Sequence, residues 1–240
     1  MFDMHCHVDL IDPMNRFCAT AAMLNISILA MTTTPKAYYA ETRMLANYSS
    51  VNVALGLHPQ LVSERKQELA IFDRYAASSR FIGEVGLDFS KRFYSSKEDQ
   101  IIVFEHIIQS CARAKTISIH SAFADKQVLD ILDKYKTTEH NNCILHWYSG
   151  SLAQLERAIE MGCYFSINEQ MLKSINGTKI IERIPIERIV LESDAPFVAG
   201  INKAELLQGS LTRTQDGLSK MKDGAVKNIL DYTSRILLGI

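Results

Sequence analysis

Short apolar runs alternate with longer segments of helical periodicity along most of the chain. The runs are rich in Val, Ile, Leu and Phe and contain few polar positions, which is typical of strands buried on both faces of a parallel sheet. The pattern predicts eight strands, at residues 2–5, 28–31, 51–57, 80–85, 116–120, 142–146, 163–167 and 188–192.

Helical patterns fill the segments between these runs. Ile101, Phe104 and Ile108 recur at the spacing of one helix face, and a helix over 151–161 is expected to end at Gly162. Eight strands alternating with helices favour an α/β fold of the (β/α)8 TIM-like barrel type over an open sheet. The 240 residues match one such barrel, so we expect a single domain over 1–240. The least regular stretch, 198–214, is expected to be a long loop before a final helix over 215–238.

Composition narrows the class of protein. The net charge of −1 provides no global basic field for the capture of long DNA, although bound metal ions would add local positive charge. The five cysteines form no CxxC pair, which favours a reducing compartment, and we expect the cytoplasm. No secretory signal is recognisable, and no apolar run reaches the ~20 residues of a membrane span.

Histidines and acids stand at the ends of the apolar runs. In a β/α barrel the carboxyl ends of the strands face the active site. Five of the seven histidines occupy such positions. The strand-end residues that we expect to hold metal are His5, His7, Glu84, His120, His146 and Asp194.

These residue types suit a divalent metal centre. His5 and His7 are two apart on a strand, so their side chains project from one face and form a two-ligand clip. Imidazole with carboxylate suits Zn or Mn, and carboxylates also accept Mg, so we expect one or two divalent metal ions (Mg, Mn or Zn). Glu84 is the candidate bridge between two ions. Asp194 is the candidate ligand that also accepts the proton of the attacking water.

The same segments resemble a known family. Met4-His5-Cys6-His7, Gly56-Leu57-His58-Pro59, Gly83-Glu84-Val85-Gly86-Leu87-Asp88, His120-Ser121, His146-Trp147-Tyr148-Ser149-Gly150 and Glu192-Ser193-Asp194-Ala195-Pro196 are similar to the TatD family of metal-dependent DNases, within the amidohydrolase-like barrels. The resemblance runs from residue 3 to about 197. It implies a metal-dependent barrel that hydrolyses DNA phosphodiester bonds, with the family's ligand roles on the six residues above. His58 and Asp88 match positions that line the family's site and contact substrate.

Longer stretches resemble one branch of that family. Met31-Thr32-Thr33-Thr34-Pro35, His146-Trp147-Tyr148-Ser149-Gly150-Ser151 and Gly162-Cys163-Tyr164-Phe165-Ser166 look like the branch found in Qat anti-phage defence systems. That resemblance implies a bacterial protein acting beside an ATPase and a QueC-like protein.

Two departures from the family pattern bear on substrate binding. Ser121 is followed by Ala122, Phe123 and Ala124, where the family has an Arg, and residues 197–203 lack the family's basic stretch. The metal site therefore looks intact while the phosphate-binding cations are altered. The main hypothesis is a DNase that favours single-stranded or end substrates. The alternatives are a metal-dependent amidohydrolase or lactonase acting on a small molecule, and a defence-complex subunit with altered catalysis.

Overall fold

The computed structural model describes residues 1–111, 113–198 and 200–240. It contains two compact units, each with its own strands and helices. The first unit comprises Met1–Met31, Glu41–Val53 and Phe165–Ile240, and the second comprises Thr32–Ala40 and Ala54–Tyr164. Within the described residues, the search for a helix both long and apolar enough to cross a membrane found none.

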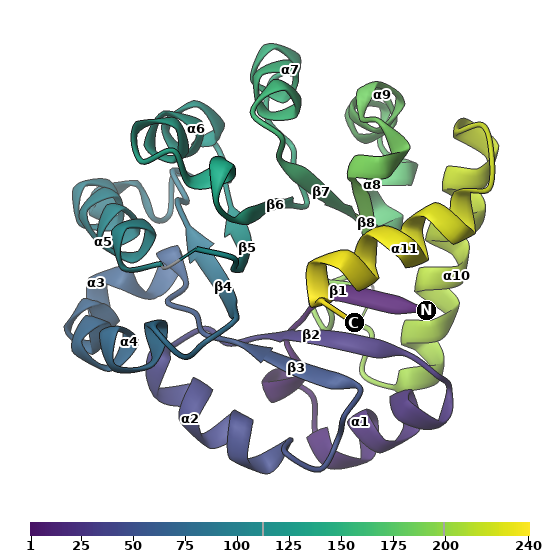
Figure 1. The fold of residues 1–240 in the computed structure, drawn as a ribbon, viewed down its shortest axis with the longest axis horizontal. Coiled ribbons are helices and arrows are strands. Elements are labelled where there is room, and N and C mark those ends of the chain that lie inside the picture. The colour runs from purple at the N-terminus through teal and green to yellow at the C-terminus, as the bar shows by residue number, and fades with distance from the viewer. Residues whose placement is uncertain (112, 199) are drawn as a thin grey trace. The chain divides into compact units, whose positions relative to one another are not determined.

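The strands of the first unit bring the two ends of the chain together. β1 (Phe2–Cys6) pairs in parallel with β2 (Ser27–Met31), and β3 (Val51–Ala54) lies on the other side of β2. β7 (Tyr164–Ile167) pairs in parallel with β8 (Ile189–Leu191). β8 lies beside β1, as Figure 1 shows near the N-terminus.

Helices cover the strands of the first unit. They are α1 (Met14–Met23), α8 (Glu169–Lys173), α9 (Ile175–Arg183), α10 (Ala204–Met221) and α11 (Val226–Leu238), with the short 3-10 helices η1 (Val8–Leu10) and η6 (Ile186–Arg188). α10 packs on α1, and α11 packs on β8 (Figure 1). The buried residues of α10 include Leu207, Leu211 and Leu218, which lie on one face at helical spacing.

The strands of the second unit form a parallel sheet in sequence order. β4 (Phe81–Gly86), β5 (Thr116–His120) and β6 (Asn142–His146) are neighbours in that order. The register pairs Gly86 with His120 and Ile119 with Leu145. Because the three strands are parallel, their carboxyl ends meet at one edge of the sheet.

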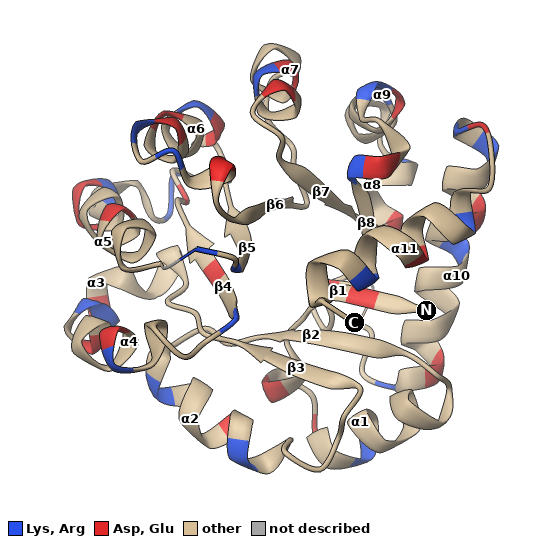
Figure 2. Cartoon of the chain, viewed as in Figure 1, with Lys and Arg blue, Asp and Glu red and all other residues tan. Residues whose placement is uncertain are grey.

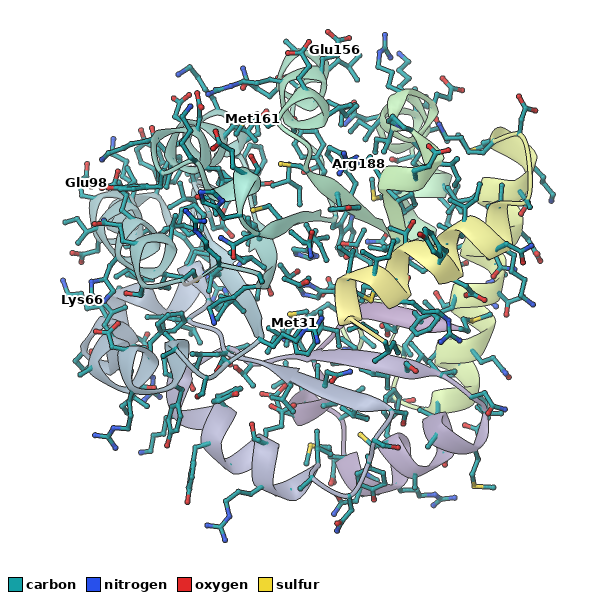
Figure 3. The ribbon with its side chains drawn as sticks, viewed as in Figure 1. Met31, Lys66, Glu98, Glu156, Met161 and Arg188 are labelled. Atoms are coloured by element: carbon teal, nitrogen blue, oxygen red, sulfur yellow. The ribbon has the colours of Figure 1, made fainter. Side chains whose placement is uncertain are left out.

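The helices of the second unit carry most of its charge. They are α3 (Val62–Arg65), α4 (Leu69–Ala76), α5 (Lys97–Ser110), α6 (Asp125–Lys134) and α7 (Leu152–Glu160), with the 3-10 helices η2 (Pro59–Leu61), η3 (Lys66–Glu68), η4 (Tyr94–Ser96) and η5 (Thr137–Glu139); α2 (Pro35–Met44) has residues in both units. Figure 3 shows Lys66 and Glu98 pointing outward from η3 and α5. Figure 2 shows strands almost without charge, and their only charged residues are Asp3 in β1 and Glu84 in β4.

The structure bears out the eight strands and corrects three other expectations. β3 ends at Ala54, before the expected end at residue 57. The loop predicted over 198–214 is wrong, because α10 begins at Ala204; within that loop, Ala199 lies outside the described residues. The final helix is two helices, separated at 222–225 where Gly224 has φ +88°. The buried face of α10 includes the polar residues Ser210 and Thr214, so the spacing of its hydrophobic residues alone did not reveal the helix. The expectation of one domain over 1–240 stays a prediction.

Candidate active site

Three predicted ligands of the first unit lie together where β1 and β8 end. His5 and His7 are both buried, and their Nε2 atoms lie 3.3 Å apart. The Oδ1 atom of Asp194 lies 3.6 Å from Nε2 of His5 and 3.7 Å from Nε2 of His7. Two imidazole nitrogens and a carboxylate oxygen at these separations can converge on one small cation.

Hydrogen bonds to β1 fix the position of Asp194. Its N–H donates to the carbonyl of His5 at 2.9 Å, and the N–H of His7 donates to the carbonyl of Ala195 at 2.8 Å. Asp3 accepts hydrogen bonds from the Ser193 hydroxyl at 2.6 Å and from the Ser193 N–H at 2.9 Å. Burial raises the pKa of Asp3 to about 7, against the lowering effect of these hydrogen bonds. The segment after β8 is therefore attached to β1 on both sides of the two histidines.

Another buried carboxylate of the first unit, Glu192, was not predicted as a site residue. It accepts a hydrogen bond from Asn168 Nδ2 at 2.9 Å and another from the Ser166 hydroxyl. Its position two residues before Asp194, at the end of an apolar run, is the sequence signal that could have identified it. The Phe197 ring also lies edge-on to the His7 ring, with centroids 5.3 Å apart.

The second unit places Glu84 among three histidines. Its Oε1 atom lies 2.6 Å from Nδ1 of His120 and 3.2 Å from Nε2 of His146, and its Oε2 atom lies 3.2 Å from Nε2 of His58. Glu84 is almost completely buried. The register of the sheet explains the cluster, because β4, β5 and β6 are adjacent and Glu84, His120 and His146 all lie toward their carboxyl ends.

The histidines control the charge of Glu84. Burial alone would raise its pKa, but the neighbouring His58 and His146 and the contact with His120 hold the pKa well below its ordinary value. Burial acts in the opposite direction on His120, whose pKa is nevertheless raised by its contacts with Asp88 and Glu84. Glu84 is therefore a carboxylate anion facing imidazole nitrogens.

Asp88 lies behind His120 and is held by amides. Its Oδ2 atom lies 3.2 Å from Nε2 of His120 and accepts a hydrogen bond from Gln60 Nε2 at 2.7 Å. The Asp88 backbone is also fixed, because its N–H donates to Gln100 Oε1 at 2.7 Å. Burial favours the neutral acid, but the contact with His120 and hydrogen bonds from Ser90 and Gln60 lower the pKa of Asp88 below its ordinary value. Gln60 and Gln100 are positioning residues that the sequence did not reveal.

The donor atoms of the second unit fit a divalent metal. One ligand atom from each of His58, Glu84 and His120 lies within 4.8 Å of the others. Imidazole nitrogen and carboxylate oxygen are the donors that Zn, Mn and related ions accept in proteins. Asp88 against the far nitrogen of His120 is the carboxylate partner that orients a metal-binding imidazole. His58, which the sequence placed with the substrate contacts, is thus also placed among potential metal ligands.

A model of the TatD-related DNases matches residues 2–237. The chain belongs to this family. An uncharacterised metal-dependent hydrolase of Buchnera aphidicola is 26% identical over 84% of this chain and 80% of its own. Human deoxyribonuclease TATDN3 is 23% identical over 98% of this chain and 92% of its own, and the 3'-5' ssDNA/RNA exonuclease TatD of Klebsiella pneumoniae is 26% identical over 75% and 70%. As a TatD-related protein, the chain is a metal-dependent hydrolase.

Solved structures of TatD-related proteins share the fold. The TatD homologue YJJV of Escherichia coli superposes with a TM-score of 0.86 at 21% identity, covering 100% of this chain and 98% of its own. A TatD-family hydrolase of Entamoeba histolytica gives a TM-score of 0.80 at 15% identity, covering 99% and 97%. These similarities and the alternating parallel strands and helices confirm the predicted (β/α)8 fold class.

Proposed function

We propose that this protein is a divalent-metal-dependent deoxyribonuclease that favours single-stranded DNA or DNA ends. The observation that carries the proposal is Glu84, a buried carboxylate in contact with His58, His120 and His146. Membership of the TatD-related DNases and the single-strand activity named for the Klebsiella relative support the reaction class.

Potential ligands for divalent ions lie in each of the two units. In the first unit, His5, His7 and Asp194 would hold metal, and in the second unit Glu84, His120 and His146 would do so. A divalent ion, when bound, would supply Lewis acidity and neutralise charge on the phosphodiester oxygens.

The protein's own side chains would perform the remaining steps. Asp194 would accept the proton of the attacking water, a role worth ~10²–10⁴-fold in rate. Asp88 would keep His120 in one orientation. His58, whose Nε2 lies 3.2 Å from Glu84, would contact the phosphodiester.

The preference for single strands follows from the shortage of cations. The net charge is −1, and His120 is followed by Ser121 and Ala122 rather than a basic residue. Few phosphate contacts would form outside the metal ions, and each neutralised phosphate adds ~0.7–0.9 to the slope of log affinity against log salt. We therefore expect a shallow slope.

The test is degradation of end-labelled DNA by the purified protein supplied with Mg, Mn or Zn. A short single strand, its duplex and a closed circular plasmid are compared across salt concentrations, with Glu84→Gln as the inactive control. The proposal expects faster cleavage of the single strand than of either duplex. Faster cleavage of the plasmid with a steep salt slope would contradict the preference, and cleavage by Glu84→Gln at more than a tenth of the wild-type rate would contradict the role given to Glu84.

The same ligands suit a metal-dependent amidohydrolase or lactonase, which is the alternative function. Amide and lactone substrates therefore belong in the same assay. Their hydrolysis by the wild-type protein, with DNA left intact, would favour the alternative.

The defence role rests on the segments that resemble the Qat branch, including Met31-Thr32-Thr33-Thr34-Pro35 and His146-Trp147-Tyr148-Ser149-Gly150-Ser151. In that role the protein would act in the cytoplasm beside an ATPase and a QueC-like protein. Phage plating on cells with the whole system tests it. Loss of protection in Asp194→Asn cells that retain the assembled proteins would show that hydrolysis matters. Full protection by that variant would favour a non-catalytic subunit.

A further inference from the structure

An exposed aromatic ring stands at the carboxyl end of β5, three residues beyond His120. Phe123 is 81% exposed. Its φ is +55°, in the left-handed region that glycine and asparagine enter readily and bulky residues avoid. Exposure of the apolar ring to water and the left-handed backbone both disfavour a phenylalanine at this position. Strained residues persist only where the surrounding structure holds them in place, and they are concentrated at functional sites.

A second aromatic residue with the same backbone feature follows the neighbouring strand. Trp147 comes directly after His146, has φ +39° and is partly exposed. β5 and β6 are parallel neighbours, and the His120 and His146 rings at their ends have centroids 5.6 Å apart. Two large aromatic residues therefore follow neighbouring strands at the same edge of the sheet, each within three residues of a histidine that contacts Glu84.

The loop after β4 is tied to the chain just before Phe123. The N–H of Phe89 donates to the carbonyl of Ala122 at 2.9 Å. The Phe89 ring lies edge-on to the Tyr94 ring, with centroids 6.2 Å apart, and Tyr94 is half exposed. The hydrogen bond to Ala122 anchors the turn that presents Phe123. The turn from 121 to 124 offers aromatic surface and no cation.

We propose that Phe123 is a nucleobase-binding residue: the base next to the cleaved phosphodiester stacks on its ring, with Trp147 as a second ring at the same edge. This inference rests on the proposed deoxyribonuclease function and names how that site selects its substrate. Every base offers a flat face that stacks on an aromatic ring. In a duplex that face is covered by the adjacent base pairs, so Phe123 selects unpaired bases.

The first test measures binding without hydrolysis. Full-length protein in EDTA is titrated into a fluorescein-labelled single-stranded oligonucleotide, either intact or abasic at its terminal residues. Phe123→Ala is expected to weaken binding of the intact strand about 5- to 150-fold, the range of one lost stacking contact. Phe123→Trp keeps the affinity, and Phe123→Leu, which is apolar but not aromatic, loses most of it. Tyr232→Ala, an exposed aromatic residue in the middle of α11, is the matched control and leaves binding unchanged.

The second test measures cleavage by the metal-loaded enzyme. Phe123→Ala is expected to raise KM for the intact strand with little change in kcat, and to leave KM for the abasic strand unaltered. A general packing defect would raise KM for both strands, whereas loss of a base contact raises KM only for the strand that has the base.

The outcomes separate this inference from the proposed function. Cleavage of single strands by the wild-type protein, with Phe123→Ala equally good or equally impaired on both strands, overturns the nucleobase contact alone. Phe123-dependent binding without any hydrolysis supports the contact and overturns the deoxyribonuclease. Absence of both binding and cleavage overturns both. Retained affinity in Phe123→Leu assigns the side chain to a nonspecific apolar contact with the DNA and overturns the stacking contact.

Discussion

The Oε1 atom of Glu84 lies 2.6 Å from the Nδ1 atom of His120, and the Glu84 side chain is almost completely buried. Removing the negative charge while keeping the shape tests what this contact does. We expect Glu84→Gln to lower hydrolysis by more than about 10²-fold and to reduce the metal content, because an amide is a weaker ligand and carries no charge.

The measurements are the rate on a labelled single strand and elemental analysis of the purified protein. Glu98→Gln is the control, since the Glu98 side chain is 72% exposed on the outer side of α5. Wild-type metal content with activity above a tenth of normal in Glu84→Gln would contradict the assigned role.

Asp194 is suited to an equally mild substitution. Its φ is +49°, a conformation that asparagine tolerates well, so in EDTA Asp194→Asn should unfold at the same temperature as the wild type. We expect a loss of ~10²–10⁴-fold in rate, the worth of a positioned proton acceptor. The experiment pairs single-turnover cleavage with thermal unfolding. A folded variant with nearly full activity would show that another group accepts the proton.

Metal removal should lower stability as well as activity. A ligand present at 100 times its Kd stabilises the folded state by about 2.7 kcal/mol. For a chain of this length each kcal/mol shifts Tm by about 2–4 °C, so dialysis against EDTA should lower Tm by about 5–10 °C. Adding Mn, Mg or Zn back should restore it. The Glu84→Gln variant should show a smaller shift, and an equal shift in that variant would place the metal elsewhere.

Stability in acid should depend on Glu169 at the start of α8. Hydrogen bonds from Arg213 at 2.8 Å and Lys173 lower the pKa of Glu169 from 4.5 to about 2. Because the folded-state pKa lies below the unfolded one, the contribution is full above about pH 4.5 and disappears as the pH falls toward 2. The exposed partners screen the interaction, so Glu169→Gln should lower the free energy of unfolding at pH 7 by about 1 kcal/mol.

Urea unfolding of the wild type and Glu169→Gln at several pH values measures this difference. It should narrow as the pH falls below about 4.5. Glu98→Gln is again the control. A difference that stays constant with pH would assign the loss to packing rather than to charge.

Two glycines should respond to alanine in opposite directions. A Cβ on Gly56 would lie 1.9 Å from the Thr32 carbonyl oxygen and 2.5 Å from the Glu84 nitrogen, so backbone beside Glu84 would have to move. Gly209, within α10, would meet only the flexible end of Arg213, at 3.0 Å. We expect Gly56→Ala to destabilise by about 3 kcal/mol or more and to reduce activity. Gly209→Ala should stabilise by about 0.5–1 kcal/mol. Similar effects of both on urea midpoints would contradict this difference.

The sequence predicted the parts of the molecule that depend on local pattern. An apolar run that ends in a histidine or an acid marks both a buried strand and its carboxyl end, which is why His5, Glu84, His120 and His146 could be placed on strands β1, β4, β5 and β6. The order of the runs also predicted parallel pairing, since each strand is followed by a helix.

Features that depend on contacts distant in sequence were not predicted. The helix α10 buries Ser210, whose hydroxyl donates to Glu169 at 3.1 Å, 41 residues earlier in the chain. A serine is predicted to be exposed unless its hydrogen-bond partner is known. The hydrogen bond from Asn168 to Glu192, which lies 24 residues later in the chain, could not be predicted for the same reason. The left-handed backbone at Phe123 has no signature in an Ala-Phe-Ala sequence.

The hydrogen bond from Ser193 to Asp3 joins residues 190 positions apart. A ribosome adds about 5–20 residues each second, so Asp3 is made roughly 10–40 s before the residue that pairs with it. Until then the amino-terminal strand has no neighbour on its β8 side, so its apolar residues remain exposed and can contact other chains. The nascent protein therefore has a long interval in which it can aggregate, and slowing translation upstream of residue 193 should lower the yield of folded protein without altering its final stability.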